Sequence, residues 1–124
     1  MSPSYQDSLA IFEAFDKRHL PLFIAYYRLS LPRFIQIKEW LEAKEIGAIR
    51  HINWVLTKSP SKEDLSDHHV LRTDHKIAPG GYFEDLASHV LDLFTYYLGT
   101  IEMVNGISLN QQDLYSARDA VVVS

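Results

Sequence analysis

A helix bounded by glycines constrains this chain more than any other feature. Gly80 and Gly81 precede it and Gly99 follows it, so the sequence predicts a helix from Tyr82 to Leu98. Apolar residues recur along it at the spacing of one helix face: Phe83, Leu86, Val90, Leu93 and Tyr97. We therefore expect this helix to bury one side and to leave another side for polar groups.

Three ionisable side chains share a face of the same predicted helix. Asp85, His89 and Asp92 are spaced at i, i+4 and i+7, which puts them on one face at 3.6 residues per turn. Imidazole titrates near neutral pH, and a carboxylate one turn away can fix its tautomer. Asp85 and His89 are therefore candidate acid–base residues, while Asp92 is a weaker candidate that would orient His89 or bond the backbone. The alternative is an ordinary i,i+4 pair on a helix surface.

The sequence before this helix predicts two further helices and two strands. Ser4–Asp7 resembles a capping box, which starts a helix that ends near Arg18–His19. Leu22–Tyr27 is an uninterrupted apolar run, typical of a strand buried on both faces of a parallel sheet. A helix then begins at Pro32 and ends near Glu45, and the residues from Ala48 to Thr57 have the composition of a strand.

A long polar segment, Lys58–Gly81, separates that strand from the glycine-bounded helix. Loops of this length are usually functional or mobile. Its histidines are His68, His69 and His75. With His89 they would form a metal site, but their spacing matches no standard ligand pattern, so a metal-dependent hydrolase is the least favoured function. Arg72 is a cation in this segment that is suited to binding an anion.

The C-terminal residues predict a hairpin. Its strands are Ile101–Leu109 and Asp119–Val123, joined by a connection rich in Gln, Asp, Tyr and Ser. The apolar strand Ala120–Val123 reaches the end of the sequence without a polar finish. Because natural sheets rarely leave such a strand uncovered, we expect the domain to be truncated at its C-terminal end.

Composition excludes several classes of protein. The 124 residues suit one domain, and a hydrophobic content of 47% excludes a disordered chain. The net charge of −4, with scattered basic residues, indicates neither a nucleic-acid groove nor an anionic membrane patch. Cysteine is absent, which excludes disulfides, and no apolar run approaches the roughly 20 residues of a membrane span. A soluble cytoplasmic protein is expected.

Four segments carry a resemblance to a known family. They are Ala25–Arg28, Leu31–Phe34, Ile46–Arg50 and Gly80–Asp92, the last containing Asp85-x-x-x-His89. In this order and at this spacing the chain resembles the Gfo/Idh/MocA oxidoreductases, which include glucose–fructose oxidoreductase and inositol dehydrogenase. The segment from Gly80 to Asp92 is the most specific part of the resemblance, which extends over nearly the whole chain.

The resemblance implies an α/β (α+β) fold made from parts of two domains. Family members have an N-terminal Rossmann domain and a C-terminal domain with an open mixed, mostly antiparallel sheet and helices on one face. Residues 1–28 would be the last helix and strand of the first domain. Residues 29–124 would be an incomplete C-terminal substrate and oligomerisation domain. The glycine fingerprint and the Glu-Lys-Pro motif with its catalytic lysine would lie upstream of Met1.

The resemblance also implies roles for five residues. The family transfers hydride between NAD or NADP and a hydroxyl of a sugar, polyol or related small molecule. His89 would be the general base, and Asp85 would bond the substrate or orient the imidazole. Tyr27, Arg28 and Arg72 match positions near the cofactor, although Leu71 replaces a common tryptophan and Leu29 a common second arginine.

The resemblance sets the expected partners as well. We expect a sugar- or polyol-like substrate, a cofactor bound mostly outside this chain, and a homo-oligomer formed through the open sheet. The isolated chain is expected to be inactive. The alternative from another class is a non-catalytic binding or assembly module that keeps Asp85 and His89 without their chemistry.

Overall fold

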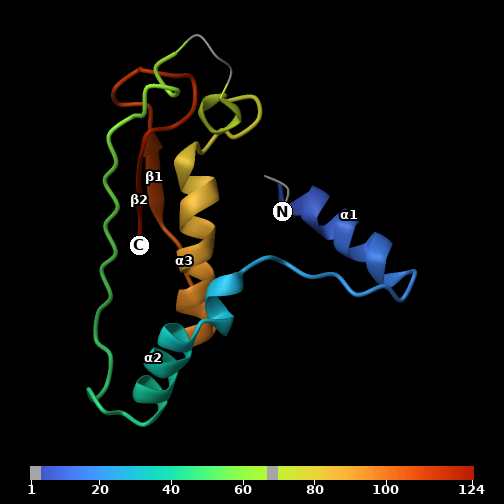
Figure 1. The fold of residues 1–124 in the computed structure, drawn as a ribbon, viewed down its shortest axis with the longest axis vertical. Coiled ribbons are helices and arrows are strands. Elements are labelled where there is room, and N and C mark those ends of the chain that lie inside the picture. Colours follow the sequence, from blue (N-terminus) through green and yellow to red (C-terminus); the bar gives the residue numbers. More distant parts are fainter. Residues whose placement is uncertain (1–3, 67–69) are drawn as a thin grey trace.

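The computed structural model describes residues 4–66 and 70–124. Its helices are α1 (Tyr5–Asp16), α2 (Pro32–Glu42) and α3 (Tyr82–Leu98), with 3-10 turns η1 (Tyr27–Ser30) and η2 (Leu71–Thr73), and its strands are β1 (Gly106–Leu109) and β2 (Ala120–Val123). Figure 1 shows α1 standing apart from the other helices and the hairpin, joined to them by an extended segment. Among the described residues, no helix has the length and apolarity that a membrane crossing requires.

Helix α3 has the predicted bounds and carries most of the small core. Gly81 precedes it with a φ of 61°, and the carboxylate of Glu84 accepts a hydrogen bond of 2.7 Å from the Gly80 N–H. Gly99 ends it with a φ of 92°. The buried apolar residues of the described fold are Ala87, Val90 and Leu93 of α3, together with Ala117. The glycine-bounded helix of the sequence is therefore confirmed at both ends.

Helix α2 packs across the C-terminal half of α3. Pro32 occupies its first turn, where a missing N–H costs nothing. The Lys38 ammonium donates to the Tyr96 carbonyl at 2.7 Å, and the Tyr97 hydroxyl donates to the Phe34 carbonyl at 3.2 Å. These bonds fix the crossing of the two helices below the position of His89.

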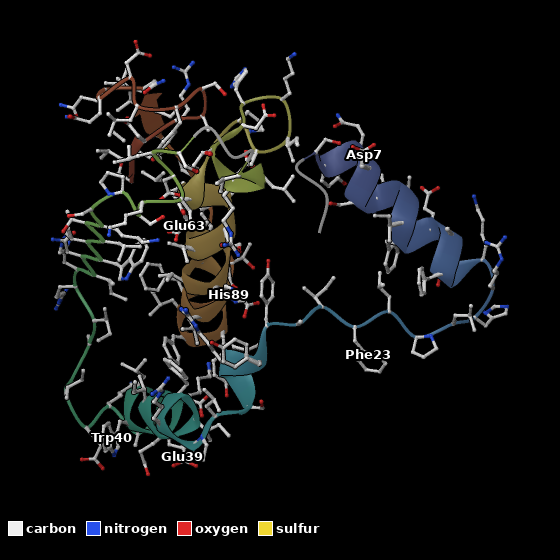
Figure 2. The ribbon with its side chains drawn as sticks, turned by 45° about the horizontal axis from the view of Figure 1, so that its top comes forward. Asp7, Phe23, Glu39, Trp40, Glu63 and His89 are labelled. Atoms are coloured by element: carbon white, nitrogen blue, oxygen red, sulfur yellow. The ribbon has the colours of Figure 1, made fainter. Side chains whose placement is uncertain are left out.

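Helix α1 and the segment after it remain outside the core. The side chain of Ser4 caps α1 by accepting from the Asp7 N–H, as the capping-box pattern predicts, and no residue of α1 is buried. Residues 21–26 that follow belong to no helix or strand, and Phe23 projects from them with 86% of its surface exposed (Figure 2). The prediction of a doubly buried strand at Leu22–Tyr27 is wrong for this structure: the segment has no ladder partner among the described residues, and Tyr27 already belongs to η1.

The described sheet is a single antiparallel pair. Gly106 pairs with Val123 and Leu109 with Ala120, so the predicted hairpin is confirmed, with a first strand shorter than Ile101–Leu109. The predicted strand at Ala48–Thr57 is wrong for this structure, because residues 48–57 are extended and exposed but pair with no described segment. The α/β class is confirmed, with two described strands of the wider sheet we expected.

The chain buries little surface for its mass. Its accessible surface is 9996 Å² for 14.3 kDa. A compact folded monomer of this mass exposes roughly 6800 Å² by the usual scaling of surface with mass. The additional accessible surface comes from α1, the extended segments and the hairpin. The large apolar side chains of these elements are mostly solvent-accessible.

Candidate active site

His89 lies midway along α3 (Figure 2), where two tyrosines from the start of η1 meet it. The ring of Tyr26 packs edge-on at 5.4 Å between centroids, and the ring of Tyr27 does so at 5.9 Å. The Nδ1 atom of His89 is buried and has no hydrogen-bond partner within the described part of the chain. A buried imidazole nitrogen normally has a hydrogen-bond partner, so a ligand group that bonds to Nδ1 would satisfy it.

Asp85, one turn before His89, pairs with a different residue from the one the sequence predicts. Its Oδ2 lies 2.7 Å from the Nε of Arg72. The side chains are 58% exposed for Arg72 and 38% exposed for Asp85, so the pair contributes only about 0–1 kcal/mol to stability. Asp85 therefore does not fix the His89 tautomer through Nδ1. It brings Arg72, a residue of the long loop, to the face of α3 that carries His89.

An open cleft of about 560 Å³ joins these groups. Ile24 and Tyr26 of the extended segment, Arg72 of the loop, and Asp85, Ser88 and His89 of α3 all line it. The structure thus gathers three of the predicted site residues, Arg72, Asp85 and His89, in one cavity. Sequence reasoning missed Tyr26 and Ser88, because a tyrosine in an apolar run and a serine within a helix carry no signal of their own.

Tyr27 and Arg28 lie next to this cleft but do not line it. Tyr27 contacts the His89 ring and is otherwise largely exposed. Arg28 is half-buried, and its guanidinium has no hydrogen bond or ion pair with any described residue. An unpaired, partly buried guanidinium is well suited to an anionic ligand.

Asp92, the third member of the predicted stripe, is half-buried on α3. Burial raises the pKa of the Asp92 carboxyl, and the neighbouring His89 acts in the opposite direction. It does not line the cleft. This placement fits the weaker role that the sequence predicts for it.

Residues 34–124 match the model of the GFO/IDH/MocA C-terminal domain. The chain belongs to the Gfo/Idh/MocA family. The curated protein Oxidoreductase P35 of Formosa agariphila is 31% identical to it over 93 residues, which are 74% of this chain and 29% of that protein. No solved structure matches the chain significantly.

The Gfo/Idh/MocA match confirms the family predicted from the sequence and makes the chain part of an oxidoreductase family. It includes Arg72, Asp85 and His89, whereas Tyr27 and Arg28 precede its first residue. The chain spans less than a third of the length of its curated relative. The roles of the five residues stay predictions, because neither the match nor the relative assigns them.

A second polar cluster holds the N-terminal end of α3 in this Gfo/Idh/MocA domain. The Tyr82 hydroxyl donates to Oδ1 of Asp64 at 2.6 Å, and the Ser61 N–H donates to Oδ2 of the same carboxylate at 2.8 Å. Asp64 is only 6% exposed, and the Lys58 ammonium lies 4.4 Å from the centre of the Tyr82 ring. No sequence pattern indicated this cluster, because Lys58, Ser61 and Asp64 are spread along the long loop and far from Tyr82 in the chain.

These contacts shift the ionisation of both partners. The hydrogen bond to Asp64, helped by burial, raises the pKa of Tyr82 to about 12. Burial by itself would raise the pKa of Asp64, but the hydrogen bonds from Tyr82 and Ser61 outweigh it and the pKa is lowered.

We expect Asp64→Asn to lower the pKa of Tyr82 toward its ordinary value of about 10. Because the folded pKa is raised, the stabilisation by neutral Tyr82 is present below about pH 10 and is lost as the pH rises toward about 12. Tyrosinate absorbance measured against Tyr82→Phe isolates this titration. An unchanged Tyr82 titration in Asp64→Asn would show that the hydrogen bond does not set the pKa.

Of the three loop histidines, the described structure includes His75. His68 and His69 lie outside the described residues. His75 is exposed, and its backbone N–H donates to the Ser116 hydroxyl at 2.9 Å. Residues 4–66 and 70–124 contain no group of three or more His, Cys, Asp or Glu side chains placed to hold a metal ion.

Proposed function

We propose that this chain supplies the proton-transfer part of an active site that moves hydride between NAD or NADP and a hydroxyl of a sugar, polyol or related small molecule. The observation that carries the proposal is the buried, unpartnered Nδ1 of His89 beside an open cleft. A substrate hydroxyl that donates to this nitrogen would satisfy it. Membership of an oxidoreductase family supports the choice of redox chemistry.

His89 then acts as the general base. The neutral imidazole accepts the hydroxyl proton of the substrate while the C–H bond of the same carbon loses hydride, so that the alcohol becomes a carbonyl. The nicotinamide ring, when bound, supplies the hydride acceptor. The rings of Tyr26 and Tyr27 both pack against the ring of His89, which holds it in place for the proton transfer.

Asp85 and Arg72 serve the substrate and the cofactor in this proposal. Asp85 lines the cleft one turn from His89 and has carboxylate oxygens that accept hydrogen bonds from a second substrate hydroxyl. Arg72 binds Asp85 through Nε, at the side of its guanidinium, which leaves the edge formed by its two Nη groups open to a ligand. The unpaired guanidinium of Arg28 fits a cofactor phosphate, with Tyr27 beside it.

We also propose that the complete enzyme is longer than this chain and that residues 1–28 belong to its nucleotide-binding domain. The family match begins at residue 34, and the curated relative is more than three times the length of the matched region. The apolar segment Leu22–Ala25, which is exposed from Phe23 onward, has the composition of a strand buried in a parallel sheet. The isolated chain is then inactive.

Nicotinamide absorbance tests this function. A polypeptide that joins residues 1–124 to a nucleotide-binding domain is expected to reduce NAD or NADP in the presence of neutral sugars or polyols, and the 124-residue chain by itself is not. Cofactor reduction by the short chain would contradict the division of the site. A longer protein that binds the cofactor but oxidises no hydroxyl compound would contradict the proposed reaction.

The hairpin supports a further proposal, that the protein forms a homo-oligomer through its sheet. Ile107 and Val122 are directly paired, so their side chains share one face with Leu109, and all three are exposed. Two-stranded hairpins are marginal by themselves and need another layer.

We expect Val122→Lys to shift the mass measured by light scattering toward the monomer, with Ser108→Lys on the opposite face as the control. Equal masses for the two variants would contradict this interface.

A further inference from the structure

We propose that the connection between β1 and β2 positions Arg72, and through Arg72 the carboxylate of Asp85. The residues responsible are Ser116, Ala117 and Arg118, which contact the long loop near Thr73 and again near Pro79. The value of this positioning for catalysis rests on the proposed function, but the geometry can be tested without it.

The first attachment lies immediately after Arg72. The carbonyl of Thr73, the next residue, accepts a hydrogen bond of 3.0 Å from the Ala117 N–H and one of 3.3 Å from the Ser116 hydroxyl. The Ser116 hydroxyl oxygen also accepts the His75 N–H at 2.9 Å. Thr73 and Ala117 are both buried, so the bond between them forms away from solvent, whereas the bond between His75 and Ser116 is exposed. The backbone that carries Arg72 is therefore held from a segment more than 40 residues later.

The second attachment lies at the other end of the same loop, next to α3. The Arg118 N–H donates to the Pro79 carbonyl at 3.1 Å. The carbonyl of Arg118 also lies against Gly81, so closely that only a residue without a side chain fits there. The loop from Thr73 to Gly81 is thus fixed at both ends by three consecutive residues of the β1–β2 connection.

The β1–β2 connection is ordered enough to serve as a support. The Asn110 amide donates to the Tyr115 carbonyl at 2.7 Å. The carboxylate of Asp119 accepts the N–H groups of Gln111 and Gln112 at 2.6 Å and 2.8 Å. These bonds close the connection on itself, and the ladder of β1 and β2 joins its ends.

Arg72 needs such a support because its ion pair is weak. The Arg72–Asp85 pair is more than a third exposed on both sides, and holding a long side chain in one rotamer costs entropy. Within the described residues, no other charged group pairs with Arg72. The position of the Arg72 backbone therefore sets the fraction of time for which the Arg72–Asp85 ion pair is formed. Ser116 is a positioning residue for that backbone.

The experiment measures hydrogen exchange at the Nε–H of Arg72 by NMR in the 124-residue chain. Ser116→Ala removes both bonds of the hydroxyl, of which the one to the Thr73 carbonyl lies next to Arg72. We expect this exchange to become about five-fold faster, as loss of that one hydrogen bond implies. Ser116→Thr retains the hydroxyl and should keep the original rate. Ser108→Ala, an exposed serine in β1, is the matched control and should also keep it.

A purely structural role for Ser116 would give a different pattern. The amide of Val90, in the buried face of α3, reports on the stability of the core. Equal acceleration at Val90 and at Arg72 would overturn the proposal, as would an unchanged Arg72 rate in Ser116→Ala. If Ser116→Ala does not fold, Ser116→Thr decides: an accelerated Arg72 exchange in a folded Ser116→Thr overturns the proposal, and the original rate supports it. None of these measurements requires cofactor or turnover, so a failed proposed function would not affect them.

Discussion

Replacing His89 by asparagine is expected to reduce kcat by about 10²–10⁴-fold in a polypeptide that joins this chain to a nucleotide-binding domain. Asparagine keeps a polar group near the position of the imidazole but cannot accept a proton at neutral pH. The free energy of unfolding should change little, because His89 is only partly buried and its Nδ1 makes no bond to a described residue. Steady-state kinetics and thermal unfolding of the same preparations measure both quantities.

His51→Asn is the matched control for this prediction. His51 lies in the exposed extended segment and does not line the cleft. Its replacement should leave kcat within about two-fold, as is usual for surface substitutions away from a site. If His89→Asn retained full activity, the Asp85–His89 face would be surface pairing or part of a non-catalytic binding module, which are the two alternatives the sequence leaves open.

Gly81→Ala is expected to cost about 2–5 kcal/mol of the free energy of unfolding, the sum of a backbone term and an overlap term. The backbone term is the penalty of about 1–2 kcal/mol for a side chain at positive φ, since φ is 61° at this residue. The overlap term arises because a Cβ atom would meet the Arg118 carbonyl, which is backbone and cannot rotate away. Urea unfolding measures the total.

Gly47→Ala separates the two terms. Gly47 has a φ of 76°, but a Cβ built there meets no atom within 4 Å. It should therefore lose only the backbone penalty of about 1–2 kcal/mol. If Gly81→Ala were no worse than Gly47→Ala, the close approach of the β1–β2 connection to α3 would not be stabilising. Because Gly81 precedes the turn that carries Asp85, the larger loss should also weaken the Arg72–Asp85 contact.

The sequence was most informative where structure is local. Helix α3 could be predicted to the residue, because glycines mark both ends and its apolar positions follow the helical period. The cap at Ser4 and the proline of α2 also act within one turn of the helices they start. The hairpin was predictable for the same reason, since its strands are near neighbours in the chain.

The sequence was misleading where structure depends on distant partners. Leu22–Tyr27 and Ala48–Thr57 have the composition of strands, but a strand exists only when another strand bonds to it, and the described residues provide none. The same limit applies to the site. A carboxylate one turn from a histidine predicts a pair between them, while the observed partner of Asp85 is Arg72, brought by a loop whose position depends on Ser116 and Ala117. No local pattern contains that information.

The exposure of helix α1 has a consequence for proteolysis. It has 12 residues and none is buried, which is near the length at which an isolated helix is marginal in water. Lys17 and Arg18 follow directly, at an exposed turn where His19 has a φ of 52°. Trypsin cleaves after Lys and Arg in segments that unfold locally, so residues 17–20 form a natural cleavage point. Cleavage there separates a short N-terminal peptide from the residues that form the cleft, α3 and the hairpin.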